Sequence, residues 1–218
     1  DFTWGGFQAA VNSDLANVLG NFVHRSLTFL NKHWGGTVPD AAEAGTGGRR
    51  SGGAADLDTG GRRSGGAAEA GDAEAAIRQA LADAVREVDA AMEECSFQKA
   101  VRAQRALWQA ANVYFDQKQP WHAVKTDKAA AAVTLATCVH LCRSFALLAS
   151  PFIPFAARQL FANLALDGDP AAQSWAGIED WAAMTGRRIA PQPVPLFKKI
   201  EDAQVTELQA RFAGESKA

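Results

Sequence analysis

The chain has 218 residues, of which 48% are hydrophobic, and its formal net charge is −2 at pH 7. This length suits one large domain or two small ones, and the apolar content is sufficient for a sizeable core. The charge argues against indiscriminate nucleic-acid binding, which needs many Lys and Arg side chains on phosphates, but it leaves room for a local site. Three cysteines are too few for a disulfide framework, which favours a reducing, cytoplasmic setting.

The first forty residues predict a long amphipathic helix. Residues 1–8 begin helical, and the polar run at residues 12–14 can interrupt this helix and cap the next one. Over residues 15–34, helical spacing separates an apolar face from a polar stripe, and Gly35 and Gly36 end the helix. The predicted buried face comprises Leu15, Leu19, Phe22, Val23, Leu27, Leu30 and Trp34.

The polar stripe of this helix places Asn21 and Arg25 one turn apart. One interpretation is a solvated helix face. The other is a binding site, because Asn and Arg at this spacing suit the donor and acceptor pattern of a base edge.

Residues 45–71 differ in kind from the rest of the chain. The run T-G-G-R-R-S-G-G-A-A occurs twice, and the segment has no aromatic residue and one large apolar residue, Leu57. It cannot bury enough surface to offset the entropy of ordering, which predicts a flexible insertion between two helices. Its four arginines either contact phosphates or belong to a duplicated linker without a role.

Two further helices are expected before residue 120. One covers residues 72–94, and the next begins after the cap residue Ser96. The second of these ends at residues 117–119, and Pro120 restarts a helix there, since Pro is favoured in a first turn. The predicted buried face of the helix after Ser96 comprises Phe97, Val101, Trp108, Ala111 and Phe115.

The helix expected over residues 127–150 is apolar nearly all round, which is typical of the middle of a bundle. The segment 129–155 is long enough to span a membrane, but His140 and Arg143 lie near its middle. A central Arg costs about 2.5–3.5 kcal/mol on insertion, so a buried helix of a soluble bundle is the interpretation we adopt.

The C-terminal third begins with a helix over residues 155–166 and continues into a mixed stretch at 167–195. The run I-A-P-Q-P-V-P-L-F should lie extended over the bundle because its prolines exclude a helix, and a last helix covers residues 202–212. No stretch shows the alternation of a sheet. The expected class is therefore all-α: a bundle of about five helices with an extended Pro-rich segment and a final helix.

Chemistry-bearing groups are sparse. Cys138 and Cys142 lie one turn apart, but two ligands do not make a zinc site, and free cysteines are commonly buried as small hydrophobic residues. No phosphate-binding loop, dinucleotide fingerprint or nucleophile elbow occurs. The sequence therefore predicts neither a catalytic nor a metal site.

Trp121 follows Pro120 at a helix restart, where a large ring is hard to bury completely. Such a corner serves packing or, alternatively, stacks an unpaired base, which is worth about 1–3 kcal/mol. Lys118, Lys125 and Lys128 surround it and either meet phosphates or solubilise the surface.

Four stretches carry a family resemblance. They are D-F-T-W-G-G-F with N-S-D-L-A-N-V-L-G-N-F-V-H-R and N-K-H-W, then A-N-V-Y-F-D-Q-K-Q-P-W, L-L-A-S-P-F-I-P and V-P-L-F-K-K-I-E. In this order they resemble the anticodon-binding domain of methionyl-tRNA synthetase. Because the matches run from near residue 1 to near residue 201, the resemblance implies one such domain over residues 1–218.

The resemblance implies site residues. In the proteins this chain is similar to, the Trp of the Pro-Trp pair stacks on the first anticodon base, and the Asn and Arg one turn apart read that base. These roles fall on Trp121, Asn21 and Arg25, with Asp116 as a residue that orients the site. We expect His24 to fill the edge of the core rather than to contact the base.

The family's H-I-G-H and K-M-S-K-S catalytic motifs are missing, and the chain begins at Asp1 without Met or a signal-peptide pattern. We therefore expect the tRNA-reading part of a methionine–tRNA ligase, inactive alone, that recognises the CAU anticodon. The expected partners are the anticodon loop of methionine tRNA and the catalytic domain of the same polypeptide, where ATP and methionine bind; no membrane or DNA is expected. The alternative is a helical protein–protein interaction module without RNA binding.

Overall fold

The computed structural model describes residues 2–40 and 65–212, and these residues form an all-α bundle, as the sequence predicts. Within the two described ranges the chain forms no strand, and only Thr37 and Arg188 make an isolated antiparallel bridge. The core is one continuous apolar cluster shared by the long helices. The expected insertion at residues 45–71 falls mostly outside the described residues.

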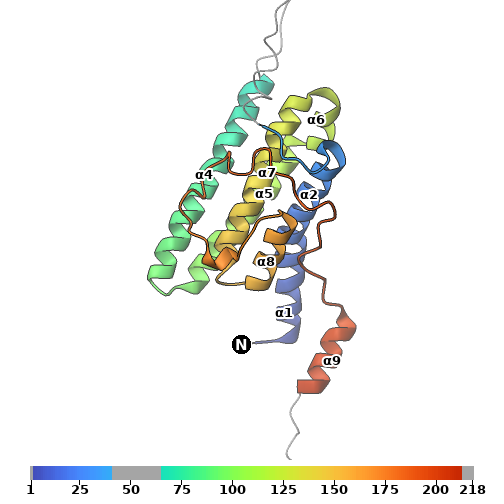
Figure 1. The fold of residues 1–218 in the computed structure, drawn as a ribbon. Coiled ribbons are helices and arrows are strands. Elements are labelled where there is room, and N and C mark those ends of the chain that lie inside the picture. The colour runs from blue at the N-terminus through green and yellow to red at the C-terminus, as the bar shows by residue number, and fades with distance from the viewer. Residues whose placement is uncertain (1, 41–64, 213–218) are drawn as a thin grey trace, which may run out of the picture.

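The chain starts with one long helical run (Figure 1) formed by α1 (Trp4–Ala10), a π-helix η1 (Val11–Gly20) and α2 (Asn21–Trp34). The predicted interruption at residues 12–14 is wrong. The Asn12 side chain instead exchanges two hydrogen bonds with the backbone of Ile200, its amide donating at 2.9 Å and its oxygen accepting at 2.8 Å. A polar residue that looked like a helix cap therefore fixes a distant extended segment to this helix.

Most of the predicted buried face of this run is confirmed. Leu19, Phe22, Val23, Leu27 and Leu30 are buried, whereas Leu15 and Trp34 are partly buried. Gly35 ends α2 in the left-handed conformation with φ of 59°, as the C-cap prediction required.

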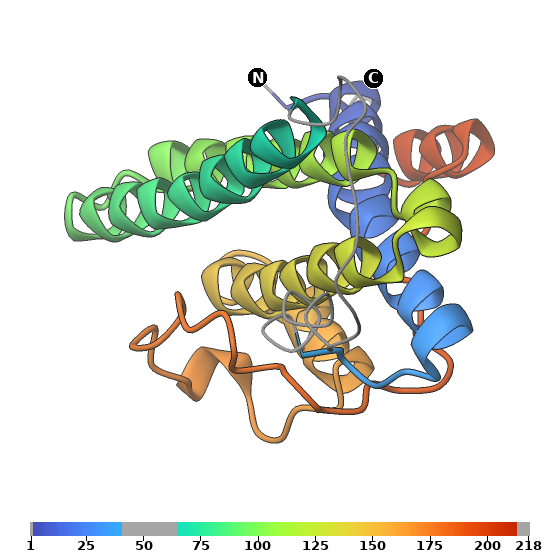
Figure 2. The same ribbon diagram turned by 90° about the horizontal axis from the view of Figure 1, so that it is seen from above.

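Helices α4 (Gly65–Glu93) and α5 (Phe97–Lys118) lie side by side as an antiparallel hairpin (Figure 2). Helix α4 begins seven residues before the predicted start at Asp72, so residues 65–71 are helical rather than part of a flexible insertion. Helix propensity does not explain this extension, because residues 65–71 contain three Gly beside three Ala.

The predicted buried face of α5 is partly wrong. Trp108, Ala111 and Phe115 are buried, but Phe97 is 56% exposed and Val101 42% exposed. The face turned to the neighbouring helices carries small residues that allow close approach, together with larger ones nearer the C-terminus: Ala100, Ala103, Gln104, Leu107, Trp108, Ala111, Tyr114 and Phe115.

Helix α6 (Pro120–Thr126) follows α5 directly and leads to α7 (Lys128–Ala149). The Asp127 side chain caps α7 by accepting a hydrogen bond of 2.9 Å from the Ala130 amide. As predicted, α7 is buried nearly all round, and Cys138 and Cys142 are fully buried within it. Helix α7 is long and apolar enough to cross a membrane. However, 89% of its apolar 18-residue stretch is buried inside the bundle.

The chain then forms α8 (Pro154–Asn163) and a 3-10 turn, η2 (Pro170–Ala172). The segment 190–200 runs extended over the bundle, and Asn163 holds it through two hydrogen bonds with the Val194 backbone, at 2.8 and 2.9 Å. Helix α9 (Asp202–Phe212) packs against α1, where the rings of Trp4 and Phe212 stack at 5.7 Å. Both the extended segment and α9 agree with the sequence-based prediction.

Candidate nucleic-acid interface

Three of the four sequence-predicted site residues meet where α2 lies beside the α5–α6 junction (Figure 1). An Arg25 Nη2 atom on α2 donates to Oδ1 of Asp116 on α5 at 2.8 Å. The Arg25 guanidinium also lies 4.4 Å from the ring centre of Phe115 and 5.6 Å from that of Trp121. Arg25 is therefore held between a carboxylate and two aromatic faces.

The turn from α5 into α6 presents Trp121. Gln119 adopts the left-handed conformation with φ of 41°, which ends α5, and Pro120 is buried as the first residue of α6. Trp121 then remains partly buried, and its ring centre is 5.9 Å from that of Phe115. Part of the indole is thus available to a ligand, as expected for a ring at a helix restart.

A groove of about 310 Å³ opens beside this arrangement. Its walls combine aromatic rings with cationic and hydroxyl groups, a composition that suits a flat, polar-edged ligand such as an unpaired base. The lining residues are His24, Arg25, Thr28, Phe29, Lys32, Phe115 and Trp121.

Asn21 does not line this groove. It borders an adjoining hollow of about 480 Å³ between the start of α2 and the extended segment, lined by Ala16, Asn17, Gly20, Asn21, His24, Pro195, Leu196, Phe197 and Lys199. His24 lines both hollows and is exposed, so the expectation that it fills the edge of the core is wrong.

The lysines near Trp121 differ in their exposure to solvent. Lys125 and Lys128 are exposed, and Lys128 lies 5.7 Å from the ring centre of Trp34. Lys118, by contrast, is only 11% exposed and pairs with Glu74 at 3.1 Å. Burial has the largest effect in lowering the pKa of His33, and the nearby positive charges of Lys32 and Lys128 lower it further.

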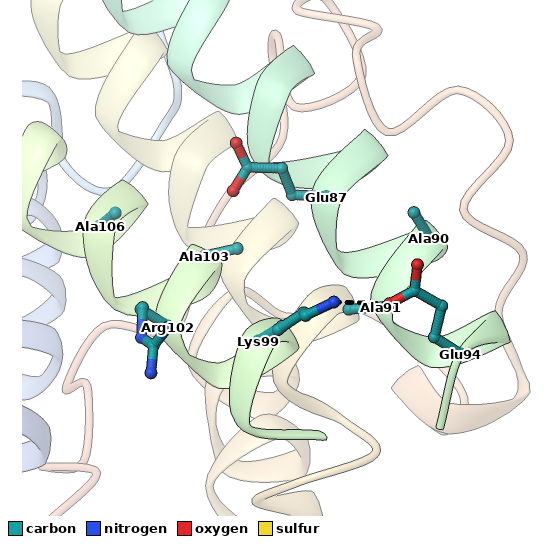
Figure 3. Close-up of a pocket in the computed structure, with 8 residues that line it drawn as sticks. All are labelled: Glu87, Ala90, Ala91, Glu94, Lys99, Arg102, Ala103 and Ala106. Atoms are coloured by element: carbon teal, nitrogen blue, oxygen red, sulfur yellow. Dashed lines mark hydrogen bonds and ion pairs between the residues drawn. The ribbon is translucent and has the colours of Figure 1, made fainter. Parts of the chain in front are cut away.

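A larger hollow of about 490 Å³ lies at the other end of the α4–α5 hairpin (Figure 3). Its lining is alanines and four charged side chains, and Lys99 and Glu94 form an ion pair of 2.8 Å across it. Because no aromatic ring lines it, this hollow offers no stacking surface for a base, and the groove at Trp121 is the better candidate.

The described part of the chain contains no group of three or more His, Cys, Asp and Glu residues placed to hold a metal ion.

The family described as the anticodon binding domain of methionyl tRNA ligase matches residues 65–217. The chain belongs to this family. Similar curated proteins include the methionine–tRNA ligase of Maricaulis maris, 39% identical over 222 residues that cover 100% of this chain and 34% of that protein. The methionine–tRNA ligase of Caulobacter vibrioides is 38% identical over 216 residues, covering 98% and 33% respectively. The chain thus spans about a third of the length of these relatives.

Solved structures agree on the fold. Apo Mycobacterium tuberculosis methionyl-tRNA synthetase is similar with a TM-score of 0.70 and 24% identity, over 92% of this chain and 35% of that one. The methionyl-adenylate-bound form of that synthetase is similar with a TM-score of 0.64 and 25% identity, over 89% of this chain and 33% of that one.

Sequence reasoning missed several groove residues of this family member. Phe115 was predicted only as part of the core, yet it also supports Arg25. Thr28 and Lys32 continue the polar stripe of α2 beyond Arg25, so the stripe itself was the signal that could have found them. Phe29 carried no such signal.

Proposed function

We propose that this chain reads the CAU anticodon of methionine tRNA, as the tRNA-binding part of a methionine–tRNA ligase. One observation carries the proposal: Arg25 is fixed by Asp116 against the rings of Phe115 and Trp121, beside an open groove. Membership in the anticodon-binding family supports the same conclusion.

The first anticodon base enters the groove and stacks on Trp121. Anticodon bases are unpaired and can be turned out of the loop, and stacking on an aromatic ring supplies about 1–3 kcal/mol per base. Stacking alone accepts any base, because every base has an aromatic face. Selectivity must therefore come from the polar groups at the edge of the groove.

Arg25 supplies that selectivity. Its guanidinium carries five N–H donors, one of which is directed at Asp116, so others can donate to the O2 and N3 acceptors of cytosine. Uracil presents an N3–H donor at that edge, and the mismatch leaves buried donors unpaired at a cost of about 1–3 kcal/mol. Asp116 acts by orienting Arg25, and Asn21 meets the RNA from the adjoining hollow.

The rest of the reaction belongs to other parts of the parent polypeptide. There we place the catalytic domain with ATP and methionine, in a cytoplasmic enzyme of protein synthesis. Anticodon recognition by this chain would help to align the acceptor end of the tRNA with that domain.

The proposal is tested by the Trp121→Ala variant. We expect it to bind an anticodon stem-loop carrying CAU about 5- to 150-fold more weakly, the equivalent of 1–3 kcal/mol of lost stacking. Fluorescence anisotropy with a labelled stem-loop measures the affinity, and circular dichroism checks the fold. Trp175→Ala is the matched control, because Trp175 is also partly buried but lines neither hollow.

Unchanged binding by a folded Trp121→Ala variant would contradict the proposal. If that variant unfolds, Asn21→Ala and Arg25→Ala replace it, and normal binding by both would show that the corner serves packing. Binding of a protein in place of RNA, insensitive to salt, would point instead to a helical interaction module.

A further inference from the structure

A polar cluster lies inside the bundle close to the α5–α6 turn, and the proposed reading of the base does not use it. We call Glu74, Tyr114, Lys118 and Thr137 the Glu74 cluster. One carboxylate oxygen of Glu74 on α4 accepts from the Tyr114 hydroxyl at 2.5 Å and from Lys118 Nζ at 3.1 Å, both on α5. The other oxygen accepts from the Thr137 hydroxyl on α7 at 3.3 Å. One carboxylate thus ties three helices together.

The members of the cluster are shielded from water. The side chains of Glu74 and Lys118 are 17% and 11% exposed, and Tyr114 and Thr137 are 2% and 4% exposed. Burial raises the pKa of the Tyr114 hydroxyl, which therefore remains a hydrogen-bond donor. An ion pair in such a place is strongly coupled to its surroundings, because removal of one partner leaves the other charge buried without compensation.

Lys118 connects the Glu74 cluster to the turn that carries Trp121. Lys118 is the last residue of α5, and the chain then passes through the left-handed Gln119 and the buried Pro120 to Trp121. A non-glycine residue in that conformation persists only where the surrounding structure holds it. Fixing the end of α5 therefore fixes the direction in which the chain enters α6, and with it the ring of Trp121.

We infer that Glu74 is a positioning residue for the RNA groove, which holds the Lys118–Trp121 turn through Lys118 and Tyr114 without touching the RNA. The inference rests on the proposed function, since it assigns Glu74 a task in base reading. The simpler alternative is that the cluster only adds stability to the α4–α5 hairpin.

The same two helices offer a matched control. At their other end Lys99 and Glu94 form an ion pair of 2.8 Å (Figure 3), but these side chains are 63% and 60% exposed. Lys99 lies in the first turn of α5, and Glu94 lies in the turn directly after α4. This pair has the same chemistry, but it lies at the opposite end of α5 from the turn that carries Trp121. Removing it changes the hairpin without changing the exit of α5.

The test uses the whole chain labelled with 5-fluorotryptophan, in which the ¹⁹F signal of Trp121 is assigned by Trp121→Phe. We expect Glu74→Gln to shift or broaden this signal and to weaken binding of the CAU stem-loop roughly tenfold. Tyr114→Phe, which keeps the ion pair, should act in the same direction but about two- to threefold. Glu94→Gln should leave both the signal and the affinity unchanged.

Each outcome decides the inference. Unchanged Trp121 signal and affinity in folded Glu74→Gln would overturn it, as would equal effects from Glu94→Gln. If Glu74→Gln does not fold, the Trp121 signal and the RNA affinity of Tyr114→Phe test the inference instead. If Trp121→Ala binds RNA normally while Glu74→Gln still moves the Trp121 signal, then the proposed function fails and the positioning of the turn stands.

Discussion

At the scale of single residues, Arg25 shows how neighbours convert a flexible side chain into a fixed one. An isolated Arg on a helix surface samples many conformations, and ordering it costs free energy. Here Asp116 takes one edge of the guanidinium and Phe115 contacts its face, while the side chain keeps 32% of its surface exposed. A guanidinium ordered in advance loses less entropy on meeting a base, which favours selectivity.

His140 is a buried titratable residue whose pKa is shifted within the range where stability can be measured. It is fully buried in α7, with Nε2 2.8 Å from the Ile178 carbonyl oxygen. Burial, and then the charge of Arg143, lower its pKa from 6.5 to about 4, although the Ile178 hydrogen bond acts in the opposite direction. The folded protein therefore binds this proton less readily than the unfolded chain between about pH 6.5 and pH 4.

We predict that the stability contributed by neutral His140 is present above pH 6.5 and is lost as the pH falls towards 4. The loss amounts to about 3 kcal/mol, at 1.36 kcal/mol for each unit of pKa difference. Urea unfolding at a series of pH values measures it. His140→Gln should flatten this part of the profile, whereas the exposed His122→Gln should not; parallel profiles for all three proteins would contradict the prediction.

Some residues of the candidate site could be predicted from the sequence, and others could not. The resemblance indicated Arg25, Asp116 and Trp121, and the structure brings these three together. Helical spacing could not show that Asn21 faces a separate hollow, because that depends on where the segment 195–199 crosses the helix. The sequence also could not show that Phe115 supports Arg25, because these residues lie on different helices and their contact depends on how the helices pack.

At the scale of elements, the turn between α5 and α6 places a non-glycine residue in the left-handed conformation. Gln119 occupies the C-terminal capping position of α5 with φ of 41° and ψ of 58°. Glycine is the usual residue there, because a Cβ atom in this conformation costs about 1–2 kcal/mol. The chain thus carries strain directly before Pro120 and Trp121.

We predict that Gln119→Gly raises the free energy of unfolding by roughly 1 kcal/mol, since relief of strain exceeds the added freedom of the unfolded chain. Gln117→Gly is the matched control: it lies two residues earlier inside α5 and should lower stability by about 1 kcal/mol. Equilibrium urea unfolding compares the two. A loss at residue 119 as large as that at residue 117 would show that the conformation is not strained.

The sequence predicted those element boundaries that depend on local chemistry. The Asp127 cap of α7, the restart at Pro120 and the bounds of α9 are of this kind. The errors arose where distant segments decide. Asn12 hydrogen-bonds Ile200 instead of capping a helix, and Phe97 stays exposed and contacts the ring of Phe152 instead of entering the core.

At the scale of the whole molecule, the bundle separates the candidate groove from the opposite end of the fold. Figure 1 shows α6 at one end, whereas the start of α1 and the α4–α5 turn lie at the other. The groove is lined by the positive charges of Arg25 and Lys32, although the whole chain has a net charge of −2. RNA binding should therefore depend on few phosphate contacts, and its salt dependence should be shallow compared with that of a basic protein.

The most direct measurement compares an anticodon stem-loop carrying CAU with one in which the first base is U, at about 50 and 200 mM salt. We predict that CAU binds about tenfold more tightly or better at both salt concentrations, because Arg25 donors match the O2 and N3 acceptors of cytosine but meet an N3–H donor in uracil. The affinities of both RNAs should fall together with added salt. Equal affinity for the two stem-loops at both concentrations would contradict recognition of the anticodon by this chain.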